Sequence, residues 1–396
     1  LANQQSSLRV ELDKLKQIRS TTNNFIGVKI LETITDLNLS SGGAVTSTLN
    51  SYVFLRERGI DIDMVTLLPY SDDDAYLGGG YDGINALPFD GKTQFVYSKN
   101  LKKFLESNRG YDIYHANGIW TYPTYKTIQV ARKEDKPCIV TIHGMLNKDA
   151  LKMTSFKKQI FLKLFQKQDL QSVAYIHATS EYEAECIRGL GITTPIAVIP
   201  NGVVDCGLKH PFSSDGIVRF GFVGRTDPVK NIDVLLSAWQ KLGNYTKNCQ
   251  LTIIGGGNDS EYSRILHTFV SEHNMNNVMF TGLLPKEKAL QEMAKLDYLI
   301  LPSRSENFGM VIPEALSMGI PCIASKGTPW KELNTLNCGW WIDGNEDSLC
   351  DAIKNTLVIS NEEYNLMAES GISLVKSKYS IDKTVDKLIN LYKALI

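Results

Sequence analysis

The sequence predicts an α/β protein built from two doubly wound domains in tandem, each a parallel sheet with helices on both faces. Short apolar segments rich in β-branched residues alternate with helical patterns along nearly the whole chain, which is typical of parallel sheets. The alternation stops at residues 205–215, which have the composition of a linker, and then starts again. A chain of 396 residues is also long enough for two domains.

Composition and charge exclude several classes of function. The 42 basic and 43 acidic residues nearly cancel, so no overall field favours nucleic acid as a partner. The seven cysteines are scattered without a CxxC pair, so neither a metal site nor a disulfide framework is expected, and a reducing compartment is indicated. No apolar run approaches the ~18 residues of a membrane span, and no signal peptide is visible. We therefore expect a cytoplasmic protein.

Residues 1–24 are predicted to form a helical extension. Leu8, Leu12, Leu15 and Ile18 follow one another at helical spacing among charged residues. The segment could be the end of a coiled coil that joins a partner or adjoining domains, or a single amphipathic helix that lies on the body of the protein. Three or four heptads are needed to identify a coiled coil, so both interpretations stay open. Because the first residue is leucine rather than methionine, we expect a processed form or a fragment of a longer chain.

The first domain is predicted over residues 25–205. It opens with a strand, a glycine turn, a helix and a second strand, which is how a doubly wound fold begins. These elements are residues 25–35, 40–43, 44–58 and 61–68. Further strands are predicted at 93–97, 111–115, 138–142, 173–178 and 195–199, and further helices at 99–107, 123–133, 147–169 and 180–189.

Two segments of the first domain have both a functional and a simpler interpretation. Residues 69–92 are predicted to be a loop, and their triplet Asp72-Asp73-Asp74 is similar to the metal-binding DxD of some sugar transferases. We favour a solvated loop, because no apolar strand delivers these acids to a sheet edge. The helix at 147–169 is amphipathic and rich in lysine, so it could contact an anionic membrane surface. We favour packing on the sheet, with the lysines in solvent.

Two histidines end predicted strands of the first domain. His115 and His143 both stand close to a glycine. Because the carboxyl ends of parallel strands meet at one edge of the sheet, both side chains would face the same crevice. A single histidine is more often a structural hydrogen-bonding group than a catalyst. We predict a functional role for His143 and a structural one for His115.

The second domain is predicted over residues 216–380, facing the first domain across a cleft. Its strands are predicted at 217–223, 250–254, 277–281, 297–301 and 321–324, and its helices at 230–242, 260–273, 285–294, 310–318, 346–358 and 361–376. A final helical pattern at 381–396 is predicted to cross back to the first domain.

The stretch from Ser303 to Glu314 carries the clearest functional signal. A polar loop follows the strand at 297–301 and opens a helix with Pro313 in its first turn. Free backbone N–H groups at such a helix start favour an anion. The carboxylates of Glu306 and Glu314 accept hydrogen bonds from hydroxyl groups and repel phosphate. The combination predicts a ligand with both phosphate and hydroxyl groups, such as a nucleotide sugar.

Three stretches of the second domain together closely resemble the retaining glycosyltransferases of the GT-B fold, in family four, the group-one glycosyl transferases. They are Phe220 to Arg225 with Lys230-Asn231, Leu251 to Gly257, and Glu306 to Glu314. The spacing of eight positions between Glu306 and Glu314 is the most specific feature. The stretches His143-Gly144-Met145-Leu146 and Pro200-Asn201-Gly202-Val203 are similar to the forms in polysaccharide-assembly members, including those of O-antigen and lipopolysaccharide. The resemblance covers residues 26–396.

The resemblance implies a role for each matched residue on the donor side. Arg225 and Lys230 would bind the donor diphosphate, where cations stabilise the charge that develops on the leaving group. Glu306 would bind hydroxyl groups of the donor sugar, and Glu314 those of the ribose. Backbone amides for the sugar and phosphate would come from Phe308, Gly309 and Met310. The nucleobase would lie near Gly256, Gly282 and Leu283.

The resemblance implies fewer roles in the first domain. Gly42 and Gly43 would close on the diphosphate, although a tight turn alone also explains two adjacent glycines. His143 would lie near the anomeric carbon and the acceptor. Asn201 would belong to the donor-binding set.

The implied function is metal-independent, retaining transfer of a hexose-type sugar from a UDP- or GDP-sugar, without a cofactor. The acceptor would be a lipid-linked glycan that belongs to a bacterial surface polysaccharide. With such an acceptor, the protein could also contact the inner face of the cell membrane peripherally. A nucleotide-sugar epimerase or a phosphorylase is a weaker alternative. The phosphorylase would need a pyridoxal-binding lysine, and no such lysine can be identified. A catalytically silent GT-B module, acting as a scaffold in a larger assembly, is the alternative from another class.

Overall fold

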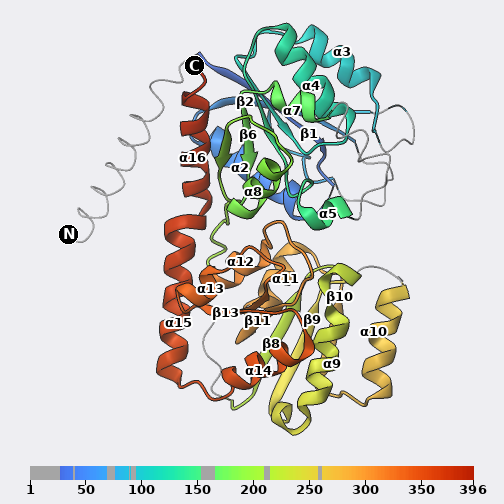
Figure 1. The fold of residues 1–396 in the computed structure, drawn as a ribbon, viewed down its shortest axis with the longest axis vertical. Coiled ribbons are helices and arrows are strands. Elements are labelled where there is room, and N and C mark those ends of the chain that lie inside the picture. Colours follow the sequence, from blue (N-terminus) through green and yellow to red (C-terminus); the bar gives the residue numbers. More distant parts are fainter. Residues whose placement is uncertain are drawn as a thin grey trace, which may run out of the picture. The chain divides into compact units, whose positions relative to one another are not determined.

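The computed structural model describes residues 27–38, 41–68, 76–88, 90, 95–152, 166–208, 215–256 and 261–396. The chain divides into two compact units. The first contains the chain up to Gly202 together with Ile381–Ile396, and the second is Val203–Ser380. Each unit has one parallel β-sheet between helices (Figure 1). The two sheets confirm the predicted α/β fold class.

The first sheet has seven parallel strands in the order β3-β2-β1-β4-β5-β6-β7. They are β1 (Lys29–Asp36), β2 (Asp61–Leu67), β3 (Ile84–Leu87), β4 (Ile113–Asn117), β5 (Cys138–Thr141), β6 (Tyr175–Ala178) and β7 (Ile196–Val198). The register of β1 and β4 places Glu32 opposite His115. Successive side chains of a strand point to opposite faces, so Ile30 and Leu31 belong to different core clusters.

The two faces of the first sheet are covered by different parts of the chain. The helices of this unit are α2 (Gly43–Glu57), α3 (Lys99–Ser107), α4 (Tyr122–Lys133), α5 (Lys148–Lys152), α7 (Lys167–Gln171), α8 (Glu181–Gly189) and α16 (Ile381–Lys393). Right-handed connections leave α2 on the face of Ile30, whereas α3, α4, α7 and α8 pack on the face of Leu31. The helix α16 packs beside α2 and completes its face with Val385 and Leu388 (Figure 1).

A chain of buried hydrogen bonds ties α16 to the sheet. His177 Nε2 lies 2.7 Å from the carbonyl oxygen of Ile199, and because a carbonyl only accepts, this nitrogen donates. Neutral His177 then accepts from the Thr141 hydroxyl at 2.9 Å. The Thr141 oxygen accepts from His115 Nε2 at 2.7 Å, and His115 Nδ1 accepts from the Tyr392 hydroxyl at 2.8 Å. Both ring nitrogens of His115 are therefore engaged inside the first unit.

The second sheet has six parallel strands in the order β10-β9-β8-β11-β12-β13. They are β8 (Val218–Val223), β9 (Cys249–Ile254), β10 (Val278–Gly282), β11 (Tyr298–Leu301), β12 (Cys322–Ser325) and β13 (Gly339–Ile342). The helical elements are η4 (Pro228–Lys230), α9 (Ile232–Leu242), η5 (Gly243–Thr246), α10 (Glu261–Glu272), α11 (Lys286–Met293), α12 (Val311–Ser317), α13 (Glu332–Thr335), α14 (Glu346–Thr356), α15 (Asn361–Leu374) and η6 (Val375–Tyr379).

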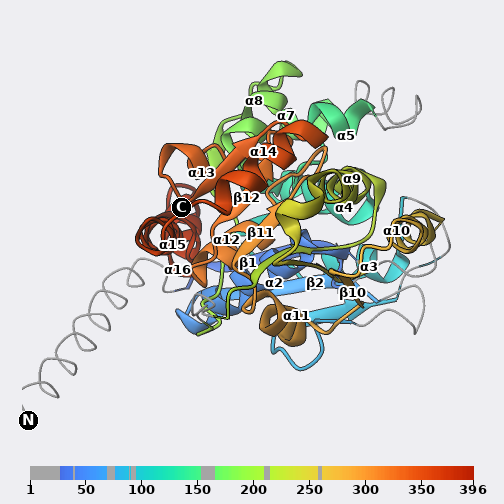
Figure 2. The ribbon, with the colours of Figure 1, turned by 90° about the horizontal axis from the view of Figure 1, so that it is seen from below.

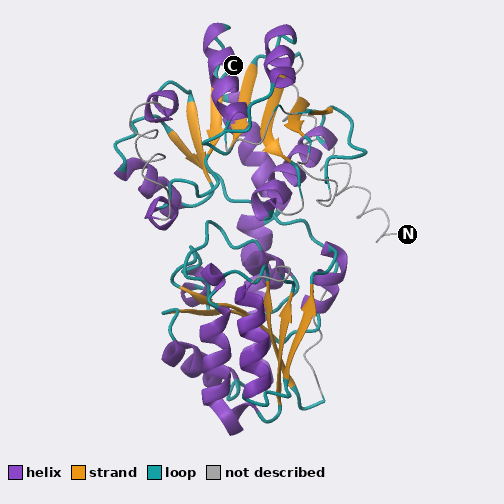
Figure 3. Cartoon of the chain, turned by 90° about the vertical axis from the view of Figure 1, so that its right-hand side faces the viewer, coloured by secondary structure: helices purple, strands orange, loops and turns teal. Residues whose placement is uncertain are grey.

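Helices cover both faces of the second sheet. On one face α9 contacts both α10 and α14, and α11 lies on the other side of the strands (Figure 2). Figure 3 shows the strands of each unit as a layer flanked by helices. A single core cluster, which includes Phe220, Trp239 and Ile300, fills this unit.

The structure corrects the prediction for one edge of the first sheet. The strand β3 is formed by Ile84–Leu87, within the segment predicted to be a loop. The strand predicted at 93–97 is wrong over residues 95–97, which form no strand. The rings of Phe95 and Tyr97 pack instead against Tyr122, with centroids 5.7 and 4.8 Å apart. The aromatic side chains of residues 95–97 are therefore a sign of packing and not of strand pairing. The strand β3 was missed because four residues are too few to show a clear alternation of apolar and polar side chains. In the second unit, α13 and β13 were not predicted.

Some predictions fall outside the described residues. They are the helix at 1–24, the triplet Asp72-Asp73-Asp74 and residues 153–165 of the basic helix. The predicted ends of that basic helix are helical, as α5 and α7. Within the described ranges, none of the helices combines the length and hydrophobicity that crossing a bilayer requires.

We predict that the first unit depends on the buried face of α16. Replacing buried Leu388 by alanine removes apolar contacts with the sheet and should cost about 2–5 kcal/mol of unfolding free energy. Asn390→Ala, on the exposed face of the same helix, is the matched control and should change stability by less than ~0.5 kcal/mol. Hydrogen exchange followed by mass spectrometry should show faster exchange in β1 and β4 for L388A only. Equal protection in both variants would contradict this role of α16.

We also predict that acid weakens the first unit through its buried histidines. Burial lowers the pKa of His177 to about 4, whereas an unfolded histidine titrates near 6.5. Between these values the unfolded state binds more protons, so stability falls as the pH drops from about 6.5 to about 4. At ~1.4 kcal/mol per pKa unit the loss is about 3 kcal/mol. Urea unfolding at several pH values measures it. H177N should reduce the pH dependence by about this amount and leave the part that comes from His115 and His143, whose pKa values burial also lowers. H273N, at an exposed position, should leave the pH dependence unchanged.

Candidate active site

The carboxyl edge of the second sheet brings together the loops after β8 and β11. The two strands are neighbours, and the chain leaves β8 toward β9 on one side and β11 toward β12 on the other. Ligands of doubly wound sheets bind at the carboxyl ends of such a pair. Residues 224–231 follow β8, and residues 302–310 follow β11. Both loops contain residues that the sequence predicted to bind the donor.

The side chain of Asn231 joins these two loops. Its backbone is in the left-handed region, with φ 60°, a conformation that asparagine tolerates. Its Nδ2 donates to the carbonyl oxygens of Pro302 and Gly344 at 3.2 and 2.9 Å, and its Oδ1 accepts from Arg304 Nε at 2.9 Å. The sequence places Asn231 in a motif next to Lys230 but gives no sign of this role.

Lys230 and Glu306 form an ion pair between the two loops. Lys230 Nζ lies 2.5 Å from Glu306 Oε1, and the side chains are only 17% and 13% exposed. The Ser303 hydroxyl donates to the same oxygen at 2.8 Å, and the Glu306 backbone N–H donates to the carbonyl oxygen of Gly327 at 2.8 Å. A Cβ at Gly327 would collide with the backbone of this loop, so the close approach requires glycine. The carboxylate is therefore held by the side chains of Lys230 and Ser303, and the backbone that carries it is held by Gly327.

The loop after Glu306 is fixed by aromatic packing. Phe308 is buried against Trp330 and Tyr379, with ring centroids 5.3 and 5.8 Å away. Trp330 Nε1 donates to the carbonyl oxygen of Phe308 at 2.5 Å. Gly309 follows with φ +77°, and Met310 leads into α12, whose first turn contains Pro313 as predicted. Phe308 thus anchors the turn with its ring.

Glu314 lies on α12 beside a lysine that the sequence did not suggest. Its Oε1 is 3.3 Å from Lys286 Nζ, at the start of α11. Burial raises the pKa of Glu314, and the Lys286 ammonium opposes this rise. Lys286 follows the exposed Leu283, and its distance from Glu314 in the sequence does not indicate that the two side chains meet. Only the fold brings the two side chains together.

A cavity of about 250 Å³ opens at the ends of β9 and β10. Its lining residues are Thr226, Gly255, Gly256, Ser263, His267, Phe280, Thr281, Gly282 and Leu283. Gly255 has φ +108° and no room for a Cβ next to the carbonyl oxygen of Gly224. The predicted Gly256, Gly282 and Leu283 therefore do lie together, and the His267 and Phe280 rings, 4.1 Å apart, are lining groups that sequence reasoning missed.

Arg225 directly precedes Thr226, which lines this cavity. Its side chain is exposed, and no ion pair or hydrogen bond joins it to another residue in the described ranges. Arg225 and Lys230 therefore differ: Lys230 has an internal partner, whereas Arg225 remains available to a ligand. Among the same residues, no cluster of three or more His, Cys, Asp or Glu side chains is arranged to hold a metal ion.

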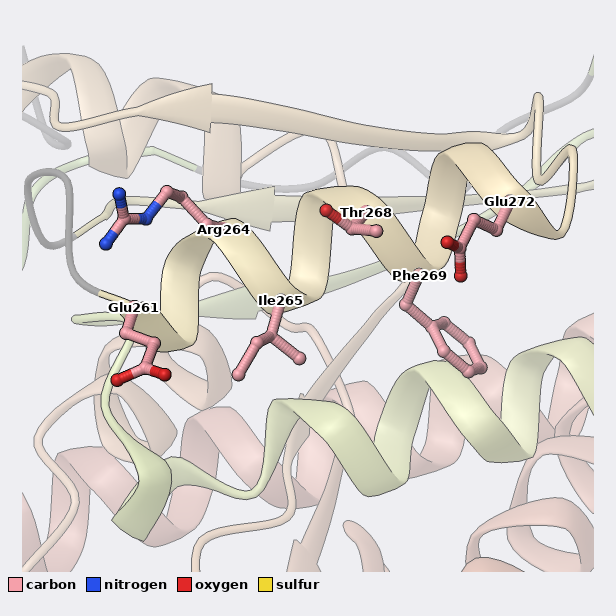
Figure 4. A pocket seen from close by; sticks show the side chains of 6 residues that line it. All are labelled: Glu261, Arg264, Ile265, Thr268, Phe269 and Glu272. Carbon is pink, nitrogen blue, oxygen red and sulfur yellow. The ribbon is translucent and has the colours of Figure 1, made fainter.

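A larger cavity, of about 450 Å³, lies along the surface of α10 (Figure 4). Its lining residues are Glu261, Arg264, Ile265, Thr268, Phe269 and Glu272. Phe269 points from α10 toward the neighbouring helix α9 in this view. None of the predicted site residues lines this cavity, so volume alone does not identify the site.

The first unit carries the other predicted residues. His143 follows β5 with φ 53°, and its Nε2 lies 2.9 Å from Asn117 Oδ1 and 3.5 Å from the hydroxyl of Thr48 on α2. Gly42, with φ +76°, precedes α2, which begins at Gly43. His143 and the start of α2 thus belong to the same edge of the first sheet.

Asn201 is buried near the end of the first unit, between β7 and Gly202. Within the described ranges, no side-chain hydrogen bond or ion pair joins Asn201 to His143 or to the two glycines, and its part in donor binding stays a prediction. The cleft expected between the units stays a prediction as well.

Comparisons with known proteins match each of the two units to a family of glycosyltransferases. Residues 213–373 match the family model described as Glycosyl transferases group 1, and residues 41–205 match Glycosyltransferase Family 4. An uncharacterized glycosyltransferase of Methanocaldococcus jannaschii is 25% identical over 317 residues, which are 78% of this chain and 82% of the relative.

Two further proteins extend this likeness. The UDP-Gal:alpha-D-GlcNAc-diphosphoundecaprenol alpha-1,3-galactosyltransferase of Escherichia coli is 26% identical over 74% of this chain and 78% of its own length. The solved structure of Anabaena HepE in complex with UDP superposes with a TM-score of 0.73 at 18% identity, covering 93% of this chain and 100% of that chain. This likeness confirms the predicted GT-B fold. The chain belongs to glycosyltransferase family 4, the glycosyl transferases group 1, whose enzymes transfer a sugar from a nucleotide-sugar donor.

Proposed function

We propose that this enzyme transfers a hexose-type sugar, with retention and without a metal, from a UDP- or GDP-sugar to a lipid-linked glycan of a bacterial surface polysaccharide. The observation that carries the donor part is the Lys230–Glu306 ion pair on the same sheet edge as a glycine-walled cavity. The acceptor part is supported by the name of the Escherichia coli relative, which specifies a diphosphoundecaprenol acceptor. Such an acceptor would bring the enzyme to the inner face of the cell membrane.

The side chains of the second unit suit the parts of a nucleotide sugar in order. The cavity lined by Gly256 and Gly282 has room for a base, and Glu314, whose side chain is 14% exposed, can accept hydrogen bonds from ribose hydroxyls. Exposed Arg225 and the Lys230 ammonium can bind the diphosphate, for which cationic donors are well matched. Glu306 would then accept hydrogen bonds from the sugar hydroxyls.

The Lys230–Glu306 ion pair keeps both charged groups ready to exchange each other for the donor as a binding partner. In the free protein each charge is partly shielded from water and satisfied by the other. A bound donor offers phosphate oxygens to the ammonium and hydroxyl groups to the carboxylate, so both groups regain hydrogen bonds when the pair opens. The cost of separating the charges is therefore offset by the ligand, and a ligand that lacks either part gains less.

The proposed reaction needs little chemistry from the protein beyond charge stabilisation. The bond between the anomeric carbon and the diphosphate oxygen breaks, and the acceptor oxygen bonds to that carbon on the same face. The acceptor proton passes to the leaving diphosphate. Negative charge accumulates on the diphosphate as the bond breaks, and preorganised cations stabilise it. The family resemblance implies this front-face course, and Arg225 and Lys230 are the cations assigned to it.

We predict different defects for the two acids of the site. Glu306→Ala should lower kcat by about 100-fold, because it removes groups that bind the reacting sugar. Binding of free UDP or GDP should be unchanged or tighter, because Lys230 loses its internal partner. Glu314→Ala should weaken binding of the nucleoside diphosphate about tenfold, or ~1.4 kcal/mol. Nucleotide release from a panel of sugar nucleotides and calorimetry with UDP and GDP measure the two effects.

Glu292→Ala is the matched control for both acids, because this glutamate also pairs with a lysine, Lys295 at 2.7 Å, but on the surface of α11. It should leave turnover and nucleotide binding unchanged. Full activity of both E306A and E314A would contradict the assigned site. Absence of nucleotide release by the unmodified chain from every donor, with nucleotide binding intact, would support the silent scaffold instead.

We predict that Arg225 acts on the diphosphate and not on the base. Arg225→Ala should weaken UDP or GDP binding by about 10- to 100-fold, the value of one charge-assisted hydrogen bond. It should leave binding of the bare nucleoside unchanged. Arg264→Ala, at an exposed position of α10, is the control and should change neither. Equal losses for nucleoside and nucleoside diphosphate would show that Arg225 does not contact the phosphates.

A further inference from the structure

We propose that Glu32, acting through Asn117, fixes the neutral ring of His143 as the tautomer with hydrogen on Nε2, so that Nδ1 is presented as an acceptor for a substrate hydroxyl. Glu32 and Asn117 are positioning residues, and His143 is the group that meets the substrate. The inference rests on the proposed function for its substrate, but its structural part can be tested without turnover.

A hydrogen-bond chain connects the three side chains across two strands and a turn. Asn117 Nδ2 donates to Glu32 Oε1 at 2.8 Å. With its amide hydrogens directed at Glu32, Asn117 presents Oδ1, an acceptor, to His143 Nε2 at 2.9 Å. A neutral imidazole has one N–H and one lone pair. Nε2 therefore carries the hydrogen, and Nδ1 keeps the lone pair.

His143 Nδ1 is shielded from solvent and has no hydrogen-bond partner among the described groups. A buried acceptor left without a partner costs about 1–3 kcal/mol, and such a group in a native structure calls for an explanation. A sugar hydroxyl is a donor of the right kind. The residue lies at the carboxyl end of β5, where ligands of doubly wound sheets bind, and this placement supports the explanation.

The backbone around His143 is held separately by a second buried acid. The Gly144 N–H donates to Glu183 Oε1, and Thr179 donates to Glu183 Oε2 from both its backbone N–H and its hydroxyl, at 2.6 and 2.9 Å. Glu183 thus holds the left-handed turn of His143 and Gly144, while Asn117 holds the ring. Because Glu183 already fixes the turn, the hydrogen bonds from Glu32 through Asn117 act only on the orientation of the His143 ring.

Glu32 itself has no evident structural reason to be an acid. It is 3% exposed in the middle of β1, and its Oε2 has no partner among the described groups. Burial raises the pKa of Glu32 to about 8, so near neutral pH the side chain is largely an uncharged hydrogen-bonding group. Leucine at this position would suit the apolar strand better. What leucine could not do is orient the Asn117 amide.

The tautomer is read directly from the full chain labelled with ¹⁵N-histidine. Long-range ¹H–¹⁵N spectra distinguish Nε2–H from Nδ1–H rings, and His143→Gln identifies the His143 signals among the six histidines. We expect the Nε2–H form in the unmodified protein. A ring with hydrogen on Nδ1, or a charged ring at neutral pH, would overturn the proposal whether or not the enzyme turns over any donor.

Substitutions of Glu32 test the positioning role. Glu32→Leu should lose the single tautomer and lower kcat by about 10- to 100-fold, the range found when the partner that orients a ligating imidazole is removed. The KM for the donor nucleotide sugar should stay unchanged. Glu32→Gln keeps an acceptor for Asn117 Nδ2 and should restore both tautomer and rate. Asn117→Leu should lose both the single tautomer and the rate, and this variant replaces E32L in the test if E32L does not fold.

Thr66→Val is the matched control. Thr66 is fully buried in β2, and its hydroxyl has no partner among the described groups, so the variant removes a buried polar group of the same sheet without touching the chain to His143. It should change neither tautomer nor rate. Unchanged kcat in E32L with a mixed or reversed tautomer would overturn the role of Nδ1. Equal defects in E32L and E32Q would show that Glu32 does not act through Asn117.

Discussion

The donor side of the molecule depends on one side-chain amide. Asn231 reaches from the turn after β8 to the loop after β11 and to the loop after β13, and it uses both its amide hydrogens and its oxygen to do so. Lys230 is its neighbour in sequence and Glu306 lies in the partner loop. The amide therefore holds together the two loops on which these charges lie.

The structure solves the problem of a buried acid in more than one way. Glu306 and Glu314 each keep a lysine beside them, Lys230 and Lys286. An ion pair can be opened by a ligand that offers both charges new partners, so these two acids are suited to binding. Glu32 has an amide beside it instead, and burial favours its uncharged form. A neutral, permanent hydrogen bond does not exchange with a ligand, and it suits a group that only orients its neighbour.

The alternation of elements and the spacing of Glu306 and Glu314 were enough to predict the fold class and the family. Both are local properties of the sequence. The partners of the acids were not predictable, because Lys286 lies on another helix at an unremarkable spacing, and Asn117 reaches Glu32 only through strand pairing. One signal was overlooked: Glu32 is an acid in the interior of a buried strand, between Leu31 and Thr33. The failed strand at 93–97 has another cause, since aromatic residues mark burial in loops as well as in sheets.

The position of α16 also affects how the protein is made. The hydroxyl of Tyr392 meets the ring of His115 across 277 positions of sequence, and the whole second unit is synthesised between the two halves of that contact. Domains generally fold in order as they leave the ribosome. Here the first sheet emerges early with one face covered only in part, by α2, and the second unit has all its strands before α16 exists. Part of the apolar surface of the first sheet therefore stays uncovered until the last helix of the chain has been made.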